Sequence, residues 1–121
     1  MSLQKNKSIV VIDDDLEFVE VMREILEDDG YTVRTVSSLT FTSFFSENPP
    51  DAFIIDVWFS DTQNSLDFIK ALRRDDTLRT VPILLVSSDT SMARLKDQGM
   101  VTSFHEKPLR VQSLLEELQT I

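Results

Sequence analysis

The chain has no cysteine and no long apolar run, and each absence excludes a class of protein or site. Without cysteine, its 121 residues can form neither a disulfide framework nor a thiolate metal site. No apolar stretch approaches the ~20 residues that a membrane-spanning helix needs. Residues 1–7 contain no apolar core of a signal peptide. We therefore expect a cytoplasmic protein that makes no contact with a membrane.

Positive charge is also scarce. The sequence has 12 Lys and Arg against 21 Asp and Glu, which gives a formal net charge of −9. A basic groove for nucleic acid is therefore not expected in this chain. The acidic excess suits a cation site or basic partners, although most of it also fits a surface that favours solubility.

Glycine and proline are few and regularly placed. Gly30 and Gly99 are the only glycines, and each follows a segment of helical pattern. A residue with left-handed backbone conformation is expected there, just past the end of a helix. Pro50 and Pro82 each precede an apolar run, where proline is tolerated at the beginning of a strand. These four residues therefore mark helix ends and strand beginnings.

Short apolar runs alternate with helical patterns along the whole chain. The apolar runs are typical of buried strands and cover residues 9–12, 31–36, 52–55, 81–86 and 104–106. The helical patterns cover residues 16–29, 38–46, 65–74, 91–98 and 111–118. This alternation predicts a doubly wound α/β fold, with five parallel strands covered by helices on both faces. We expect one domain spanning residues 1–121.

Polar residues stand at the ends of four of these runs. Asp13-Asp14-Asp15 follows the first run, Asp56 the third, Ser87 the fourth and Lys107 the fifth. In an open α/β sheet, ligands bind outside the carboxyl ends of the strands. These side chains would therefore converge at one edge of the sheet. Carboxylates with one hydroxyl and one ammonium suit a divalent cation and a phosphoryl group.

These residues, in this order and over nearly the whole chain, resemble the response-regulator receiver domain. The acid pair is Asp13-Asp14, the phosphorylatable aspartate is Asp56, the hydroxyl is Ser87, and the last motif is Lys107-Pro108. The resemblance implies a flavodoxin-like fold with strand order 2-1-3-4-5. It also implies a phosphoacceptor in a two-component phosphorelay. Asp56 would take a phosphoryl group from a histidine kinase or phosphotransfer protein and form an aspartyl phosphate.

The resemblance also implies a Mg²⁺ site, with Mn²⁺ as an alternative metal. Asp14, Asp56 and the backbone carbonyl of Trp58 would bind the metal directly, and Asp13 would hold a metal-bound water. The acid cluster also fits a helix N-terminus, with Asp14 or Asp15 as the cap and Glu17 in a capping box with Asp14. Three adjacent acids exceed what capping needs, because each disfavours the ionisation of its neighbour. We favour the metal site, with Asp15 as a cap.

Further roles follow from the resemblance. Lys107 would pair with Asp56 and then with the phosphoryl oxygens, through a cis peptide bond to Pro108. Ser87 would donate a hydrogen bond to the phosphoryl group, and Phe104 would move inward as the aromatic switch residue. Alternatively, Lys107 is a solvated surface lysine and Phe104 an ordinary core phenylalanine. His105, the only histidine, is interpreted as an ordinary strand residue rather than a phosphoacceptor or metal ligand.

The segment after Asp56 departs from the family pattern. Residues 57–65 contain neither the usual Pro nor the usual Gly, and the segment is slightly long. This departure keeps a second function open, that of a pseudo-receiver, an interaction module without phosphorylation. A phosphatase with an aspartyl-phosphate intermediate is disfavoured, because Val57-Trp58 provides no second aspartate after the nucleophile.

We expect no enzyme acting on an external substrate, but a domain that catalyses only its own phosphorylation and dephosphorylation. It would signal to a downstream protein partner or output domain through the surface around the fourth helix, fifth strand and fifth helix. A homodimer is a further option that the sequence leaves open.

Overall fold

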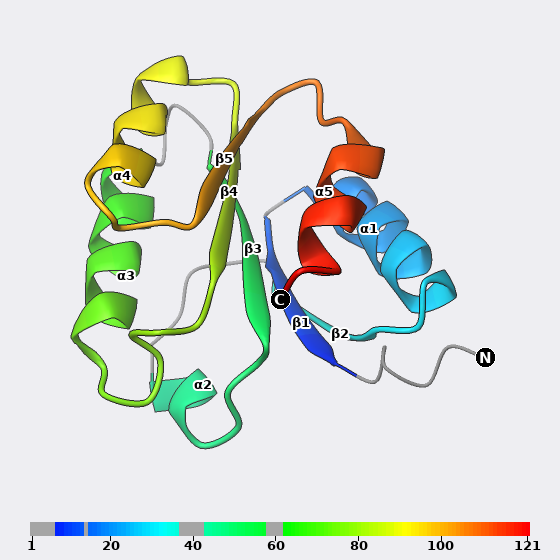
Figure 1. The fold of residues 1–121 in the computed structure, drawn as a ribbon, viewed down its shortest axis with the longest axis horizontal. Helices are drawn as coiled ribbons and strands as arrows, with labels where there is room; N and C mark the ends of the chain where they lie inside the picture. Colours follow the sequence, from blue (N-terminus) through cyan, green and yellow to red (C-terminus); the bar gives the residue numbers. More distant parts are fainter. Residues whose placement is uncertain (1–6, 14, 37–42, 58–61) are drawn as a thin grey trace.

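A five-stranded parallel sheet forms the centre of the molecule (Figure 1). The computed structural model describes residues 7–13, 15–36, 43–57 and 62–121. The strands are β1 (Ser8–Ile12), β2 (Thr32–Val36), β3 (Ala52–Val57), β4 (Ile83–Ser87) and β5 (Ser103–Glu106). Their order is β2-β1-β3-β4-β5, and every neighbouring pair is parallel. The predicted fold class and strand order are confirmed.

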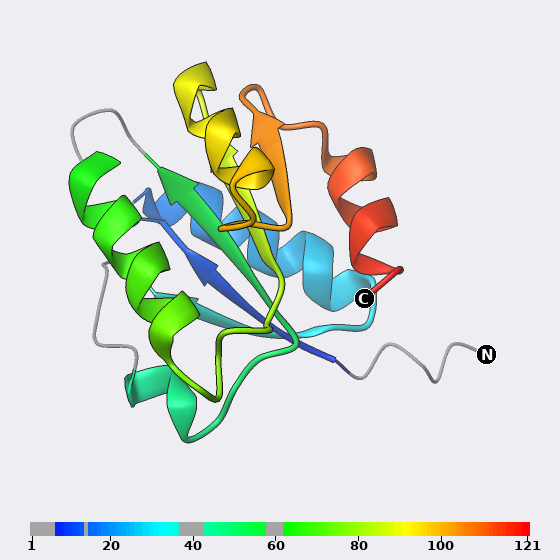
Figure 2. The same ribbon diagram turned by 60° about the vertical axis from the view of Figure 1, so that its left-hand side comes forward.

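Helices cover both faces of the sheet, as Figures 1 and 2 show. One face carries α1 (Leu16–Asp28) and α5 (Val111–Leu118). The other carries α2 (Ser43–Ser46), α3 (Thr62–Arg74) and α4 (Arg94–Asp97), which continues a 3₁₀ helix, η3 (Thr90–Ala93). No helix among the described residues has the length and apolar character that crossing a bilayer requires.

Each face of the sheet has its own apolar core, because side chains alternate along a strand. On β3, Phe53 and Ile55 join the core beneath α3 and α4, while Ile54 joins the core beneath α1 and α5. All three side chains are completely buried. A strand buried on both faces has no polar alternation, which explains the continuous apolar runs of the sequence.

The helix boundaries follow local signals in some places and not in others. The fifth predicted helix, residues 111–118, is confirmed, and the first ends one residue early, at Asp28. The third begins at Thr62, three residues earlier than predicted. The fourth is a 3₁₀ turn followed by a single α-turn, which agrees with its weak apolar pattern. Of the predicted second helix, residues 38–42 lie outside the described residues.

The turns after two helices confirm the predicted role of glycine. Gly30 has a φ of 95° and Gly99 a φ of 75°, both in the left-handed region. Residues with a Cβ rarely adopt this conformation, so glycine ends the helix there at low cost.

Candidate functional site

Asp56 and Lys107 meet at the carboxyl edge of the sheet. Asp56 is the fifth residue of β3 and only 6% exposed, and Lys107 directly follows β5. Lys107 Nζ lies 2.7 Å from Asp56 Oδ2. The backbone N–H of Lys107 donates to Ser87 O at 3.1 Å, and the peptide bond between Lys107 and Pro108 is cis. The two residues are thus brought together across β4.

The carboxyl group of Asp56 is in an environment that disfavours its charge. The pKa of Asp56 is raised from its ordinary 3.8 to about 8, and burial is the largest cause. Asp13 contributes to this rise, both as a hydrogen-bond partner and as a neighbouring negative charge. Lys107 acts in the opposite direction but does not compensate for the other two effects. The site therefore has an excess of negative charge that a cation would offset.

Asp13 and Asp15 occupy different places within the acid cluster. Asp13 follows β1, is 2% exposed, and its Oδ1 accepts a hydrogen bond from the Asp15 N–H at 3.0 Å. Asp15 is exposed and caps α1, accepting from the N–H groups of Glu17 and Phe18 at 3.0 and 3.3 Å. Its predicted role as a cap is confirmed. The interpretation with Asp14 as cap and Glu17 in a capping box is wrong, because Asp15 caps the helix instead.

The residues around Asp56 fit a hard divalent cation. Asp56 Oδ1 is buried, and no N–H or hydroxyl group of the described residues donates a hydrogen bond to it. A buried carboxylate oxygen without a donor is costly, and Mg²⁺ prefers oxygen ligands of this kind. Asp13 and Asp56 would hold the metal or its water. Asp14 and Trp58, the other predicted metal-binding residues, lie outside the described residues.

Ser87 ends β4 and is completely buried. It lies beside Val57 of β3 in the strand register, one position past Asp56. Its Oγ accepts a hydrogen bond from the Asp89 N–H at 3.0 Å. Asp89 in turn caps η3 by accepting a hydrogen bond from the Ser91 N–H. The hydroxyl of Ser87 is thus at the correct end of the sheet for the predicted phosphoryl contact.

Phe104 and His105 point to opposite faces of β5. Phe104 is partly buried and packs against the core beneath α3 and α4. His105 Nε2 lies 2.8 Å from Glu117 Oε1 of α5 and 3.2 Å from Ser103 Oγ. Glu117 was not identified from the sequence, because nothing local links it to His105. The contact joins β5 to α5 and agrees with the interpretation of His105 as an ordinary strand residue.

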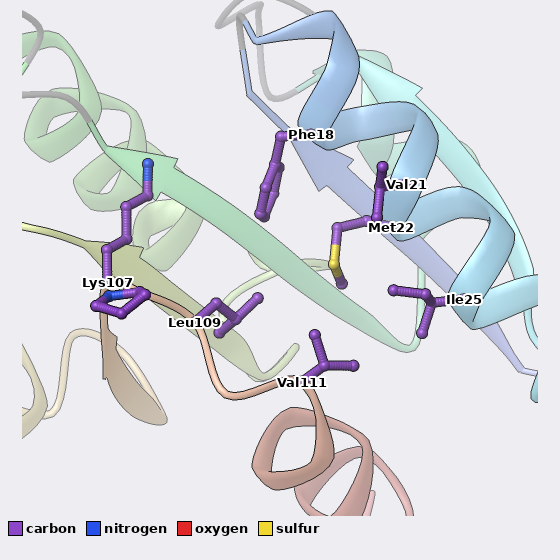
Figure 3. Close-up of a pocket in the computed structure, with 8 residues that line it drawn as sticks. Phe18, Val21, Met22, Ile25, Lys107, Leu109 and Val111 are labelled. Atoms are coloured by element: carbon purple, nitrogen blue, oxygen red, sulfur yellow. The ribbon is translucent and has the colours of Figure 1, made fainter.

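An apolar groove adjoins the site (Figure 3). It encloses about 340 Å³ between α1 and the chain that follows β5. Its lining is apolar apart from Lys107 and consists of Phe18, Val21, Met22, Ile25, Lys107, Pro108, Leu109 and Val111. No local sequence signal indicates that Phe18 lies near the site. In the structure, the centre of its ring lies 5.9 Å from Lys107 Nζ.

Comparison with known families identifies the chain. The family described as "Response regulator receiver domain" matches residues 9–119. The chain belongs to this family. Receiver domains act in two-component signalling and generally bind Mg²⁺ at their acidic phosphorylation site.

Individual relatives agree with this assignment. The receiver domain is 28% identical over 120 residues to the polar-differentiation response regulators DivK of Brucella anthropi and Brucella ovis, which covers 94% of each chain. It is similar to a solved sensor protein from Polaromonas sp. JS666, with a TM-score of 0.81, 25% identity and 94% of each chain covered. The Vibrio cholerae chemotaxis protein CheY4 has a TM-score of 0.82 at 23% identity, over 96% of this chain and 98% of CheY4, and shows the same fold.

Proposed function

We propose that this receiver domain accepts a phosphoryl group on Asp56 from the phosphohistidine of a histidine kinase or phosphotransfer protein. The contact of 2.7 Å between the ammonium of Lys107 and the buried carboxyl group of Asp56, at the carboxyl edge of the sheet, carries the proposal. Phosphoryl transfer needs mainly positioning and charge stabilisation. An ammonium held against the nucleophile provides both.

In the proposed reaction, a carboxylate oxygen of Asp56 attacks phosphorus in line with the P–N bond of the donor. The new O–P bond forms as the P–N bond breaks, and the electron pair of that bond goes to the imidazole nitrogen of the donor. Lys107 then contacts a phosphoryl oxygen, since a flexible ammonium can change partner without losing its charge. The hydroxyl of Ser87 donates a hydrogen bond to another phosphoryl oxygen. Attack of water on the same phosphorus releases inorganic phosphate and restores Asp56.

A divalent cation, Mg²⁺ or alternatively Mn²⁺, would neutralise the phosphoryl oxygens when bound. Asp14, Asp56 and the carbonyl of Trp58 would bind it directly, and Asp13 would act through water, as the family resemblance implies. The raised pKa of Asp56 supports this proposal, because a cation close by would favour the ionised nucleophile.

The same proposal includes the output of the domain. The movement of Ser87 towards the phosphoryl group would be coupled to an inward movement of Phe104, changing the surface of α4, β5 and α5. A downstream protein or output domain, or a second copy of the chain, would bind this surface. We further propose one domain over residues 1–121, in the cytoplasm, that catalyses no reaction other than its own phosphorylation and dephosphorylation.

Intact-mass measurement after incubation with acetyl phosphate and Mg²⁺ tests the proposal. Wild-type protein should gain the mass of one phosphoryl group, and Asp56→Asn should gain none. Asp97→Asn, at an exposed carboxylate of α4, is the matched control and should behave as wild type. Undiminished modification of Asp56→Asn would reject this nucleophile. Failure of the folded wild type to react would favour the pseudo-receiver instead.

A further inference from the structure

We propose that the aromatic ring of Phe18 positions the ammonium of Lys107 for phosphoryl transfer. The inference rests on the proposed function of Asp56 and Lys107 and adds a residue to that site. Lys107 Nζ lies over the ring of Phe18, 5.9 Å from its centre, and 2.7 Å from Asp56 Oδ2. The ammonium is thus held between a carboxylate and the face of an aromatic ring.

The position of Phe18 is fixed by the beginning of α1. Phe18 is the third residue of the helix, and its backbone N–H donates to the carboxylate of the cap, Asp15, at 3.3 Å. Its side chain is partly buried and packs against the core beneath α1 and α5. Figure 3 shows the ring extending from α1 into the space beside Lys107. The ring is therefore anchored at both its backbone and its side chain.

An aromatic ring suits this position because it attracts a cation without carrying charge. The negative face of the ring interacts favourably with an ammonium within about 6 Å of its centre. A carboxylate in its place would compete with Asp56 for Lys107 and add to the negative charge of the site.

The ring contact need not be broken during the reaction. Lys107 must change partner from Asp56 to a phosphoryl oxygen attached to Asp56, which is a small displacement of a long side chain. A lysine has many rotamers, and ordering them costs free energy. A neighbour that restricts the ammonium before and after transfer lowers the cost of placing it in the transition state.

Rates of phosphorylation by acetyl phosphate and Mg²⁺ test the proposal without a protein donor, so that effects on docking are excluded. Phe18→Leu keeps an apolar side chain but removes the ring, and it should react about fivefold more slowly than wild type. Phe18→Tyr keeps the ring face and should react at nearly the wild-type rate. Val21→Ala, which alters the same groove away from the ammonium, is the matched control and should leave the rate unchanged.

A second measurement reports the contact directly. The ε-methylene protons of Lys107 should show an upfield ring-current shift in the NMR spectrum of the metal-free protein. This shift should persist in Phe18→Tyr and Val21→Ala and disappear in Phe18→Leu, with all variants folded. Equal rates in Phe18→Leu and wild type, or an unchanged Lys107 signal, would overturn the role of Phe18. If wild type is not phosphorylated at all, the proposed function fails, and the NMR comparison alone decides whether Phe18 holds Lys107.

Discussion

At Asp56, burial and a second carboxylate oppose a single ammonium. The result is a carboxyl group whose pKa is about 8 in the folded, metal-free chain, far above its ordinary 3.8. A carboxyl group with this pKa is largely protonated at neutral pH, and a protonated carboxyl is a poor nucleophile. The proposed phosphoryl transfer would therefore depend on a cation that favours the charged form.

The raised pKa predicts how the stability of the metal-free protein depends on pH. Between pH 3.8 and about 8, folded Asp56 retains a proton that the unfolded chain has released. Linkage then makes the contribution of this group to the free energy of unfolding fall as the pH rises through that window. In Asp56→Asn, the free energy of unfolding should fall less steeply with rising pH, and at pH 8 it should exceed that of wild type. Urea unfolding in the presence of a chelator measures both.

The exposed Asp97 serves as the control for this experiment. Asp97→Asn should retain the pH dependence of the wild type, because its carboxylate is solvated in both states. Parallel curves for wild type and Asp56→Asn would show that Asp56 titrates normally in the folded state.

Magnesium should stabilise the chain by binding the folded state only. Ligand binding raises the free energy of unfolding by RT ln(1 + [L]/Kd). Asp14→Ala, which removes a proposed ligand and one repelling carboxylate, should raise the melting temperature without metal and abolish the increase caused by Mg²⁺. Differential scanning calorimetry with and without Mg²⁺ measures both effects. An equal Mg²⁺-induced shift in wild type and Asp14→Ala would argue against direct binding by Asp14.

Among the elements, α2 shows how a buried side chain helps to anchor a short helix. Phe45 is completely buried and makes edge-to-face contacts with two other rings. The centre of its ring lies 5.4 Å from that of Phe53 and 6.3 Å from that of Phe68. Phe44, the preceding residue, is 63% exposed and contacts only the ring of Phe45 among the aromatic pairs of the described residues. Two adjacent phenylalanines therefore differ strongly in their contribution to stability.

Alanine substitution should show that Phe45 contributes much more to stability than Phe44. Phe45→Ala leaves a cavity in the core and should lower the free energy of unfolding by about 3–5 kcal/mol. Phe44→Ala, the matched control, should cost at most about 1 kcal/mol, because it removes one ring contact and little burial. Urea unfolding measures both values. A similar loss in the two variants would mean that Phe45 is not the anchor of α2.

The C-terminal turn of α3 is tied to two loops by Arg73. Its Nε donates to Met100 O at 2.8 Å, and its Nη1 donates to Arg79 O and Val81 O at 3.0 and 2.8 Å. Partial burial lowers the pKa of Arg73. The fork of donors on one guanidinium thus satisfies three carbonyls from the segments that precede β4 and β5.

A lysine cannot reproduce this geometry, because its donors lie on one atom. Arg73→Lys should lower the free energy of unfolding by about 1–3 kcal/mol, the cost of leaving a buried carbonyl without its donor. Arg74→Lys, at the exposed neighbouring position, should stay within about 0.5 kcal/mol of wild type. Chemical denaturation of the two variants provides the test. Equal stability of both would argue against a stabilising role for the three hydrogen bonds of Arg73.

For the whole molecule, the formal net charge of −9 predicts a response to salt. Like charges on a compact chain repel one another, and salt screens them. Raising NaCl from about 0.01 to about 1 M, which shortens the Debye length from about 30 to about 3 Å, should raise the melting temperature. A decrease would show that attractive surface pairs outweigh the repulsion. Asp14→Ala should retain this NaCl effect while losing the Mg²⁺ effect, which separates screening from binding.

The sequence by itself determined the fold class, the strand order implied by the family resemblance, and the edge of the sheet where Asp13, Asp56, Ser87 and Lys107 gather. Local physics suffices for much of this. Apolar runs predict buried strands, glycine ends helices where φ is positive, and Asp15 caps α1 with a side chain two or three residues from its donors. Signals of this kind depend on near neighbours in the chain, which the sequence displays directly.

Only the tertiary structure decided how strongly each group is perturbed and which distant residues meet. The sequence distinguishes neither Phe44 from Phe45 nor Arg73 from Arg74, because burial depends on what packs against each side chain. The contact of His105 with Glu117 and that of Lys107 with Phe18 likewise join separate elements. The pKa of Asp56 is also a property of the tertiary structure. It is raised mainly by burial beneath elements that are distant in the sequence.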